Sequence, residues 1–294
     1  MDIRVLKYFL AVAQEGNITR AAEVLQMTQP PLSRQLKDLE EEIGKPLLIR
    51  GSKQVTLTED GLLLKKRAEE LVALLDKTEA ELKATDEATA GDVYIACAET
   101  DAVALLAQVA EAVQRAHPLV HYQLHSGDAS IVCEKLDRGL VDFGLVIGPV
   151  DEDKYHAIRL PGDDVWGVLM PAGHPLAAQA AVCASDLAGA PLILSHQGSV
   201  SSALVTWLHA DEAPPRVVLR YDLIYNASHF VARGLGLAIV LDNLIDTRPD
   251  SGLAFRPLAP LVTAERHLIW KKHQVFSRAS REFLRQLRAT LNPE

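Results

Sequence analysis

Hydrophobic residues near the start of the chain recur at the spacing of an amphipathic α-helix. Val5, Leu6, Phe9 and Val12 share one face of a helix that is predicted to end near Gly16. A helix with one apolar face buries that face against other elements. The pattern therefore predicts a packed domain at this end of the chain.

A second, shorter helix is predicted over residues 18–25. Asn17 is a favourable N-cap for it, and Ala21 and Ala22 allow a neighbouring helix to approach closely. The polar residues 26–28 then form a short turn before the next helix. Two short helices joined by such a turn make a helix-turn-helix unit.

The third helix is expected to follow Thr28, which can cap it, and to end at Gly44. Pro30 and Pro31 lie in its first turn, where a missing N–H does little harm. Its apolar residues, spaced four, three and four positions apart, are Leu32, Leu36, Leu39 and Ile43. One face of this helix is therefore predicted to be buried, and the opposite face is polar.

The polar face of the third helix carries candidate DNA contacts. Gln29, Ser33 and Lys37 lie one turn apart, and Pro30 and Arg34 flank them. An amide, a hydroxyl and two cations near a helix N-terminus are the groups that reach base edges and phosphates in the major groove. We interpret this helix as a recognition helix.

Two short strands, residues 47–50 and 54–57, are predicted next, with residues 51–52 as the turn between them. Arg50 and Lys53 at the tip would lie beside a phosphate backbone, as the cations of a wing do. The alternative is a solvated hairpin with ordinary surface charge. The neighbouring helix-turn-helix favours the wing.

A long helix is predicted to start at Thr58 and Glu59, and no helix breaker follows before Gly91. Its apolar side recurs at alternating spacings of four and three, which is the seam of a coiled coil. The seam consists of Leu64, Ala68, Leu71, Leu75, Thr78 and Leu82. Either the seam packs on its own chain or it pairs two subunits. We favour pairing, and expect Leu64, Leu71, Leu75 and Leu82 to dimerise the protein.

Strands and helices alternate after Gly91, and this predicts an α/β domain with parallel strands and right-handed crossovers. The first series has predicted strands 93–97, 121–125 and 142–147 and helices 101–115 and 130–137. The second has strands 165–169, 192–195, 217–221 and 268–270 and helices 200–208, 227–233 and 277–291.

Composition and charge limit the function less than the pattern does. The chain has 294 residues and a net charge of −9, which by itself argues against nucleic acid. The distribution matters more, because Lys45, Arg50 and Lys53 are the only charged residues between positions 43 and 58. The longest apolar runs, such as residues 235–241, are too short to span a membrane, and no secretion signal is visible. We expect a cytoplasmic protein.

The three cysteines, Cys97, Cys133 and Cys183, are widely separated and form no CxxC pair. This argues against a zinc site or a disulfide framework and fits a reducing compartment. Buried structural thiols are favoured over a redox sensor. No metal site and no cofactor are predicted.

Residues 17–61 resemble the N-terminal signature of the LysR-type transcriptional regulators. The resemblance lies in an AAE-x-L helix, a TQP-x-LSRQ-x-x-x-LE helix and an LT-x-x-G exit from the wing, and it runs from about residue 1 to residue 90. Pro31 stands where this family often has a small residue. The resemblance implies an operator-binding regulator that acts on double-stranded DNA as a homodimer or homotetramer, and that contacts RNA polymerase if it is an activator.

The same resemblance implies how the chain divides. Residues 1–58 would form the winged helix-turn-helix, residues 59–90 the linker helix, and residues 91–294 an effector domain like a periplasmic binding protein. Within that domain, one α/β subdomain would combine residues 92–160 and 267–294, and the other would comprise residues 161–266. The fold class is therefore multidomain α/β.

A small-molecule effector is expected between the two subdomains. In α/β folds ligands bind at the carboxyl ends of strands, where helix N-termini offer free N–H groups that suit a carboxylate. Polar residues at four strand-to-helix junctions are the candidates, and the alternative for each is simple helix capping. They are Thr100, then Ser126, Asp128 and Ser130, then Ser195 and Ser199, and finally Asn226. Thr100 also stands where the family commonly has an effector-contacting Ser or Thr.

An enzyme is the main competing class. Gly234 and Gly236 form only part of a dinucleotide fingerprint and precede an apolar run that resembles a strand. Ser195 and His196 are neighbours in sequence, and no GxSxG, HExxH or P-loop motif is present. A second alternative is a protein-binding module with a decayed DNA domain, but the intact basic residues argue against it. We expect no enzymatic activity.

Overall fold

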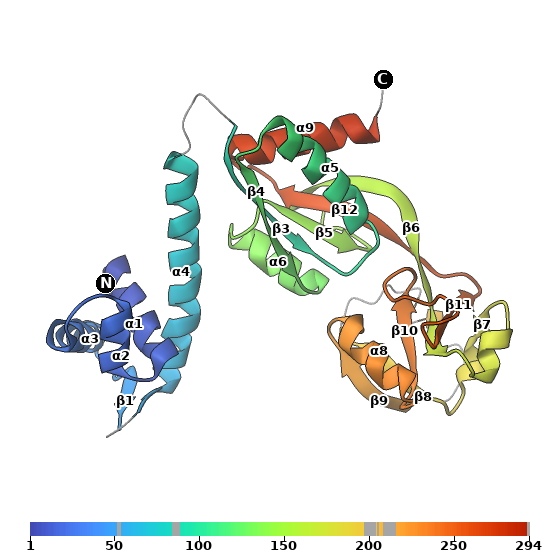
Figure 1. The fold of residues 1–294 in the computed structure, drawn as a ribbon, viewed down its shortest axis with the longest axis horizontal. Helices are drawn as coiled ribbons and strands as arrows, with labels where there is room; N and C mark the ends of the chain where they lie inside the picture. The colour runs from blue at the N-terminus through green and yellow to red at the C-terminus, as the bar shows by residue number, and fades with distance from the viewer. Residues whose placement is uncertain (52–53, 84–88, 197–203, 205, 208–215, 293–294) are drawn as a thin grey trace. The chain divides into compact units, whose positions relative to one another are not determined.

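The computed structural model describes residues 1–51, 54–83, 89–196, 204, 206–207 and 216–292 (Figure 1). The chain divides into two compact units, Met1–Lys83 and Ala84–Glu294. None of the helices in the described residues is long and apolar enough to cross a membrane.

The first unit is a three-helix bundle with a hairpin and a long helix. Its elements are α1 (Ile3–Glu15), α2 (Ile18–Val24), α3 (Gln29–Ile43), β1 (Leu48–Arg50), β2 (Val55–Leu57) and α4 (Glu59–Lys83). Phe9, Val12 and Leu32 are fully buried at its centre. Two predicted helix ends are confirmed: Gly16 closes α1 at φ 59°, and the side chain of Asn17 accepts a hydrogen bond from the Arg20 N–H at 3.1 Å.

The N-terminus of α3 differs from the prediction. Thr28 occupies the N-cap position, but its side chain makes no capping hydrogen bond. An N-cap oxygen accepts from the N–H of the second or third helical residue. Those residues are Pro30 and Pro31, which have no N–H. The prolines therefore start the helix through their fixed φ angles, and the predicted side-chain cap is wrong.

The first turn of α4 packs directly against the hairpin. β1 and β2 pair antiparallel, with Leu48 opposite Leu57. The Thr58 hydroxyl donates to the Pro46 carbonyl at 2.8 Å and accepts from the Gly61 N–H at 3.0 Å, so it caps α4. A Cβ on Gly61 would lie 2.1 Å from the Leu47 carbonyl oxygen. Glycine therefore allows α4 to start directly against β1.

The predicted seam of α4 is divided between the chain's own core and solvent. Leu64 packs against the core of the first unit, and Leu75 is half-buried. Leu71 and Leu82 are 44% and 81% exposed. The first seam position thus contacts its own chain, whereas two others leave apolar surface uncovered in the single chain.

The second unit is built around a mixed sheet with two α/β halves. Its first half begins with β3 (Gly91–Cys97), α5 (Val103–Ala116), β4 (Val120–Ser126), α6 (Ala129–Asp137) and β5 (Phe143–Ile147). The second half contains η1 (Pro175–Ala178), β7 (Val182–Cys183), η2 (Ala184–Leu187), β8 (Pro191–Ser195), β9 (Arg216–Tyr221), α8 (Ile224–Ala232), β10 (Leu237–Leu241) and β11 (Leu253–Ala259). Two strands, β6 (Tyr155–Pro171) and β12 (Thr263–Lys271), belong to both halves, and α9 (Arg278–Leu291) closes the chain.

The strand order is β4-β3-β5-β12-β6-β10-β8-β9, and β11 pairs with β6 and β7. The predicted parallel pairing is confirmed for β3 with β4 and β5, and for β8 with β9 and β10. The pairing of β12 with β5 and β6 is antiparallel, because β6 leads from the first half into the second and β12 returns from it. The apolar run after Gly236 is the strand β10, as predicted, and opens no helix.

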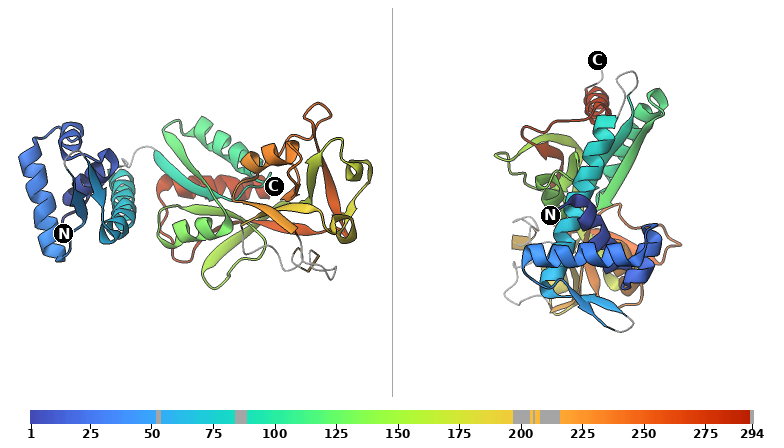
Figure 2. Two further views of the ribbon diagram at one scale, coloured as in Figure 1. Left: turned by 90° about the horizontal axis from the view of Figure 1, so that it is seen from below. Right: turned by 90° about the vertical axis from the view of Figure 1, so that its left-hand side faces the viewer.

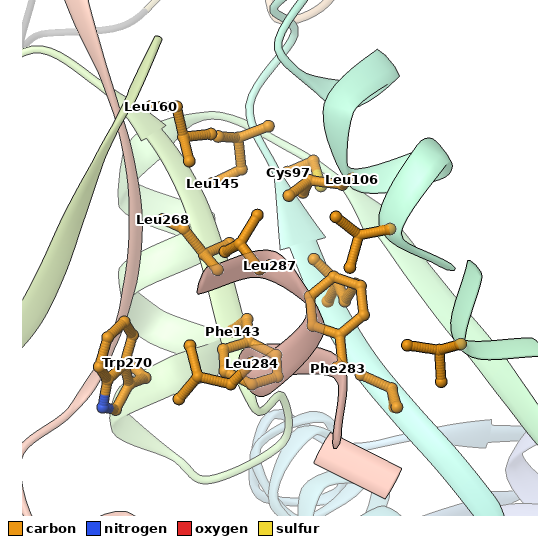
Figure 3. Close-up of a cluster of buried hydrophobic side chains, with 14 of the residues drawn as sticks. Cys97, Leu106, Phe143, Leu145, Leu160, Leu268, Trp270, Phe283, Leu284 and Leu287 are labelled. Atoms are coloured by element: carbon orange, nitrogen blue, oxygen red, sulfur yellow. The ribbon is translucent and has the colours of Figure 1, made fainter. Parts of the chain in front are cut away.

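Helices pack against the sheet in each half of the second unit. In the first half, α5 and α9 cover one face and α6 covers the other (Figure 1). Phe143, Phe283 and Leu287 are fully buried between the sheet and the helix pair, with Trp270 at the side (Figure 3). Separate apolar clusters fill the second half. The predicted α/β class with an N-terminal helix-turn-helix is confirmed.

Candidate functional site

The polar face of α3 is exposed, as its sequence pattern predicted. Gln29, Pro30, Arg34 and Lys37 are exposed and Ser33 is half-buried. The opposite, leucine face is buried in the core. The helix therefore presents an amide, a hydroxyl and two cations on one surface.

The hairpin is held against α3 by the carboxylate of Glu40. One oxygen of Glu40 accepts from the Leu47 and Leu48 N–H groups at 2.7 and 3.0 Å, and the other lies 3.2 Å from Arg50 Nη2. Arg50 also donates to the Ser33 hydroxyl at 3.4 Å. Figure 2 shows the hairpin projecting beside α3. Glu40, which the sequence analysis did not single out, thus holds Arg50 of the hairpin next to α3.

The cations on this surface differ in their partners. Lys37 pairs with Glu41 at 3.2 Å, one turn further along α3, and both side chains are mostly exposed. Arg34 forms no ion pair with any residue that the structure describes. Exposed ion pairs such as Lys37–Glu41 contribute little to stability, so Lys37 can leave Glu41 for another partner at little cost. Lys53, the other predicted wing cation, lies outside the described residues.

The two predicted strand-to-helix junctions of the first half lie at the same end of the sheet, after the last residues of β3 and β4. Cys97 lies opposite Ser126 in the parallel pair of β3 and β4, so the segments after these residues leave the sheet side by side. Asp128 caps α6: it accepts from the Ile131 N–H at 2.9 Å and from the Ser130 hydroxyl at 2.6 Å. The capping interpretation therefore accounts for Asp128, while Ser126 and Ser130 are exposed.

Thr100 is part of a cluster that links the segment after β3 to the strands β6 and β12. Its hydroxyl donates to Asp164 Oδ2 at 2.7 Å and accepts from the Ala102 N–H at 3.2 Å. Arg266 Nη2 lies 2.8 Å from Asp164 Oδ1. Burial raises the pKa of the Asp164 carboxyl, although Thr100 and Arg266 both oppose the shift. The buried Nε of Arg266 has no hydrogen-bond partner among the described residues.

Glu99 connects the first half to the second. Its carboxylate accepts from the N–H of Ile224, the first residue of α8, at 2.6 Å. Burial raises the pKa of Glu99, and the hydrogen bond from Ile224 partly opposes this. A carboxylate of the protein itself therefore occupies the helix N-terminus at which an anionic ligand is usually expected.

The junction residues of the second half are placed unequally. Ser195 ends β8 opposite Tyr221 of β9, so it neighbours the segment that leads into α8. Asn226 lies inside the first turn of α8 and is exposed, so it caps no helix. Its predicted position at the strand-to-helix junction is wrong by one turn, because Leu223 is the N-cap. Ser199 lies outside the described residues.

Sequence reasoning missed Glu99, Asp164 and Arg266. Glu99 directly precedes Thr100 at the end of a strand, so its position could have been noticed. Asp164 and Arg266 come from β6 and β12, and nothing in a single sequence indicates that these two strands pair. The fold nevertheless brings Arg266 to Asp164, the hydrogen-bond partner of Thr100.

The cysteines differ in exposure. Cys97 is buried, and burial raises the pKa of its thiol to about 12. Cys133 is partly buried and Cys183 is exposed at the end of the short edge strand β7, so the expectation of buried thiols holds only for Cys97. Within the described residues, no group of His, Cys, Asp or Glu side chains is arranged to hold a metal ion.

Comparison with known proteins decides the family. Residues 3–62 match the model of the bacterial regulatory helix-turn-helix protein, lysR family, and residues 86–292 match the LysR substrate binding domain. The chain belongs to the LysR-type transcriptional regulators. This LysR-type regulator is a DNA-binding protein whose second unit binds an effector that modulates it.

Several relatives resemble this LysR-type regulator along most of their length. It is 31% identical to the Hca operon transcriptional activator HcaR of Escherichia coli over 97% of this chain and 96% of that protein. It is also 31% identical to the regulator BsdA of Bacillus subtilis over 82% and 83% of the two chains. The crystal structure of CbnR has the same fold, with a TM-score of 0.76, 20% identity and coverage of 99% and 100%.

Proposed function

We propose that this regulator reads its operator with the polar face of α3. Gln29, Ser33, Arg34 and Lys37 would contact base edges and phosphates, and Arg50 and Lys53 would contact the flanking backbone. The observation that carries the proposal is the exposed polar face beside a hairpin anchored by Glu40. A solved structure of the same fold, CbnR with its target DNA, supports this mode of action for the fold.

DNase footprinting on the DNA next to the gene that encodes this regulator tests the operator proposal. A protected region should appear at a salt concentration at which unrelated DNA is unprotected, because specific binding exceeds non-specific binding by orders of magnitude. Uniform weak protection of both DNAs would contradict it.

We propose further that the effector binds where the two α/β halves meet, next to Thr100 and Glu99. The halves touch there through the Glu99–Ile224 hydrogen bond, so a ligand that inserts at this point changes their arrangement. Arg266 is mostly buried, and its Nε has no partner among the described residues, which suits a hydrogen-bond acceptor. A small carboxylate that replaces Glu99 at the N-terminus of α8 fits these groups.

A thermal-shift screen with small carboxylates and their amides tests this effector class. The carboxylate should raise the melting temperature and its amide should not, because the amide lacks the charge that pairs with Arg266. Hits should also change operator affinity by a factor that corresponds to a coupling of about 1–3 kcal/mol. Stabilisation by amides alone would contradict the carboxylate.

We also propose that the protein acts on DNA in the cytoplasm as a homodimer or a homotetramer paired through α4. The exposed leucines Leu71 and Leu82 support the pairing. Two-fold pairing would place recognition helices roughly 34–36 Å apart, so operator half-sites should repeat about one helical turn apart. Its relative HcaR is a transcriptional activator. If this chain activates too, it contacts RNA polymerase.

A further inference from the structure

A cavity in the first α/β half lies apart from the cluster around Thr100. Its volume is about 290 Å³, and it opens between α6, the end of β5, the following loop and β6. The lining comes from the first half alone, at residues 129, 130, 133, 146, 147, 149–151, 155 and 269. Ser130 is the one residue it shares with the predicted effector junctions, and neither Glu99 nor Arg266 takes part.

The walls of this cavity are mainly apolar. Ala129, Val146, Val150 and Ile269 contribute aliphatic surface. Behind them lies a close-packed cluster of buried residues between α6 and the sheet. The cavity is partly open to solvent, so a ligand can enter it without rearrangement of these walls.

Its polar groups are mostly uncharged or already partnered. The Tyr155 hydroxyl donates to Asp137 at 2.8 Å, and burial raises the pKa of this phenol. Burial also raises the pKa of Cys133, although a hydrogen bond with Tyr155 opposes it, so the thiol stays protonated at neutral pH. Asp151 is the one acid in the lining, and Lys154 lies 3.9 Å from it.

We propose that this cavity is a second ligand site, which takes an uncharged, single-ring aromatic or similarly compact apolar molecule with one hydrogen-bonding group. A dry cavity of ~150 Å³ accommodates benzene, so about twice that volume holds a substituted ring. The lining contains no lysine or arginine, and Asp151 repels anions. The site therefore differs in ligand chemistry from the junction around Arg266, and it does not rest on the effector proposal.

Two probes of matched shape test the site on the full-length protein. Calorimetry should detect binding of 4-methylbenzyl alcohol, and Ala129→Leu should abolish it by filling the cavity. Ala289→Leu, at an exposed alanine of α9, is the matched control and should bind as the wild type does. The cavity should not take 4-methylbenzoate, because this molecule carries a negative charge. Any binding of 4-methylbenzoate is therefore expected elsewhere on the protein and should persist in Ala129→Leu. Cys133→Met fills the cavity one turn further along α6 and should also abolish binding of the alcohol.

Alkylation of Cys133 then locates the ligand. In a Cys183→Ser background, iodoacetamide reports on Cys133, because Cys97 is buried. The alcohol at about ten times its dissociation constant should slow the reaction about tenfold, since only unliganded protein reacts. The proposal is overturned if neither 4-methylbenzyl alcohol nor p-cresol binds. It is equally overturned if the alcohol binds a folded, DNA-binding Ala129→Leu variant as tightly as the wild type, or leaves Cys133 unprotected.

Discussion

The hydroxyl of Thr100 has a structural role, and we have proposed that it also lies beside the effector. Its oxygen already has two partners, Asp164 and the Ala102 N–H. Thr100 is 4% exposed, so a ligand reaches its hydroxyl only if the surrounding contacts rearrange. If the proposed effector site is correct, we expect Thr100 to influence it through the positions of Asp164 and Arg266 as much as by direct contact.

Replacing Thr100 by Val should weaken both the fold and the effector response. The substitution removes the donor to a buried carboxylate and leaves the Ala102 N–H unpaired, so we expect a loss of about 1–3 kcal/mol in the free energy of unfolding. Chemical denaturation measures this. Thr100→Ser keeps the hydroxyl and should retain most of the stability. A Val variant that is at least as stable as the Ser variant would contradict the role of the hydrogen bonds.

Glu99 should make stability depend on pH. Burial raises its pKa above 4.5, so the folded chain holds this proton more tightly than the unfolded chain does. The corresponding stability is present below the unfolded pKa and is lost as the pH rises through the folded pKa. Glu99→Gln keeps an oxygen for the Ile224 N–H without the charge. Its melting temperature relative to the wild type should therefore increase from about pH 4 to about pH 7. A constant difference over this range would contradict the assignment.

At the scale of elements, α4 combines two roles along its length. Its first turns pack on their own unit through Leu64 and begin against β1 at Gly61. Further along, Leu71 and Leu82 are exposed on one side, three helical turns apart. The helix is therefore anchored at its start and apolar where a second copy of the chain can pair with it.

Leu71→Asp combined with Leu82→Asp should abolish dimerisation and leave the chain folded. Both side chains are exposed in the single chain, so the charges disturb a subunit contact and not the core. Ala73→Asp, at an exposed position on the opposite side of α4, is the control. Analytical ultracentrifugation measures the outcome. A double variant that sediments like the wild type would rule out pairing through this surface.

The elements were predictable from the sequence to different degrees. Periodicity and end residues such as Gly16, Asn17 and Gly44 determine the first three helices, since each signal is local. The long strands β6 and β12 were underestimated, because their partners are distant in sequence and their pairing depends on the whole sheet. The exposed polar face of α3 was predictable because it is one face of one helix. The cluster around Thr100 was not, because its members come from three separate segments.

At the scale of the whole molecule, the chain joins a DNA-binding unit to a ligand-binding unit. An effector can regulate such a protein only if it binds one arrangement of the assembly more tightly than another. In our proposal the α3 surface contacts the operator, and an effector changes the arrangement of the second unit at the contact of Glu99 with α8. The account therefore depends first on whether α3 recognises the operator.

The affinity of Arg34→Ala for its operator and for unrelated DNA, measured at several salt concentrations, tests this recognition most directly. Arg34 is exposed on α3, and its replacement should weaken specific binding by about 1–3 kcal/mol if it reads a base. If Arg34 contacts only phosphate, affinity should fall evenly on both DNAs with a shallower salt dependence. Arg248→Ala, at an exposed arginine of the second unit, should bind as the wild type does. Wild-type operator affinity of Arg34→Ala at every salt concentration would contradict the account.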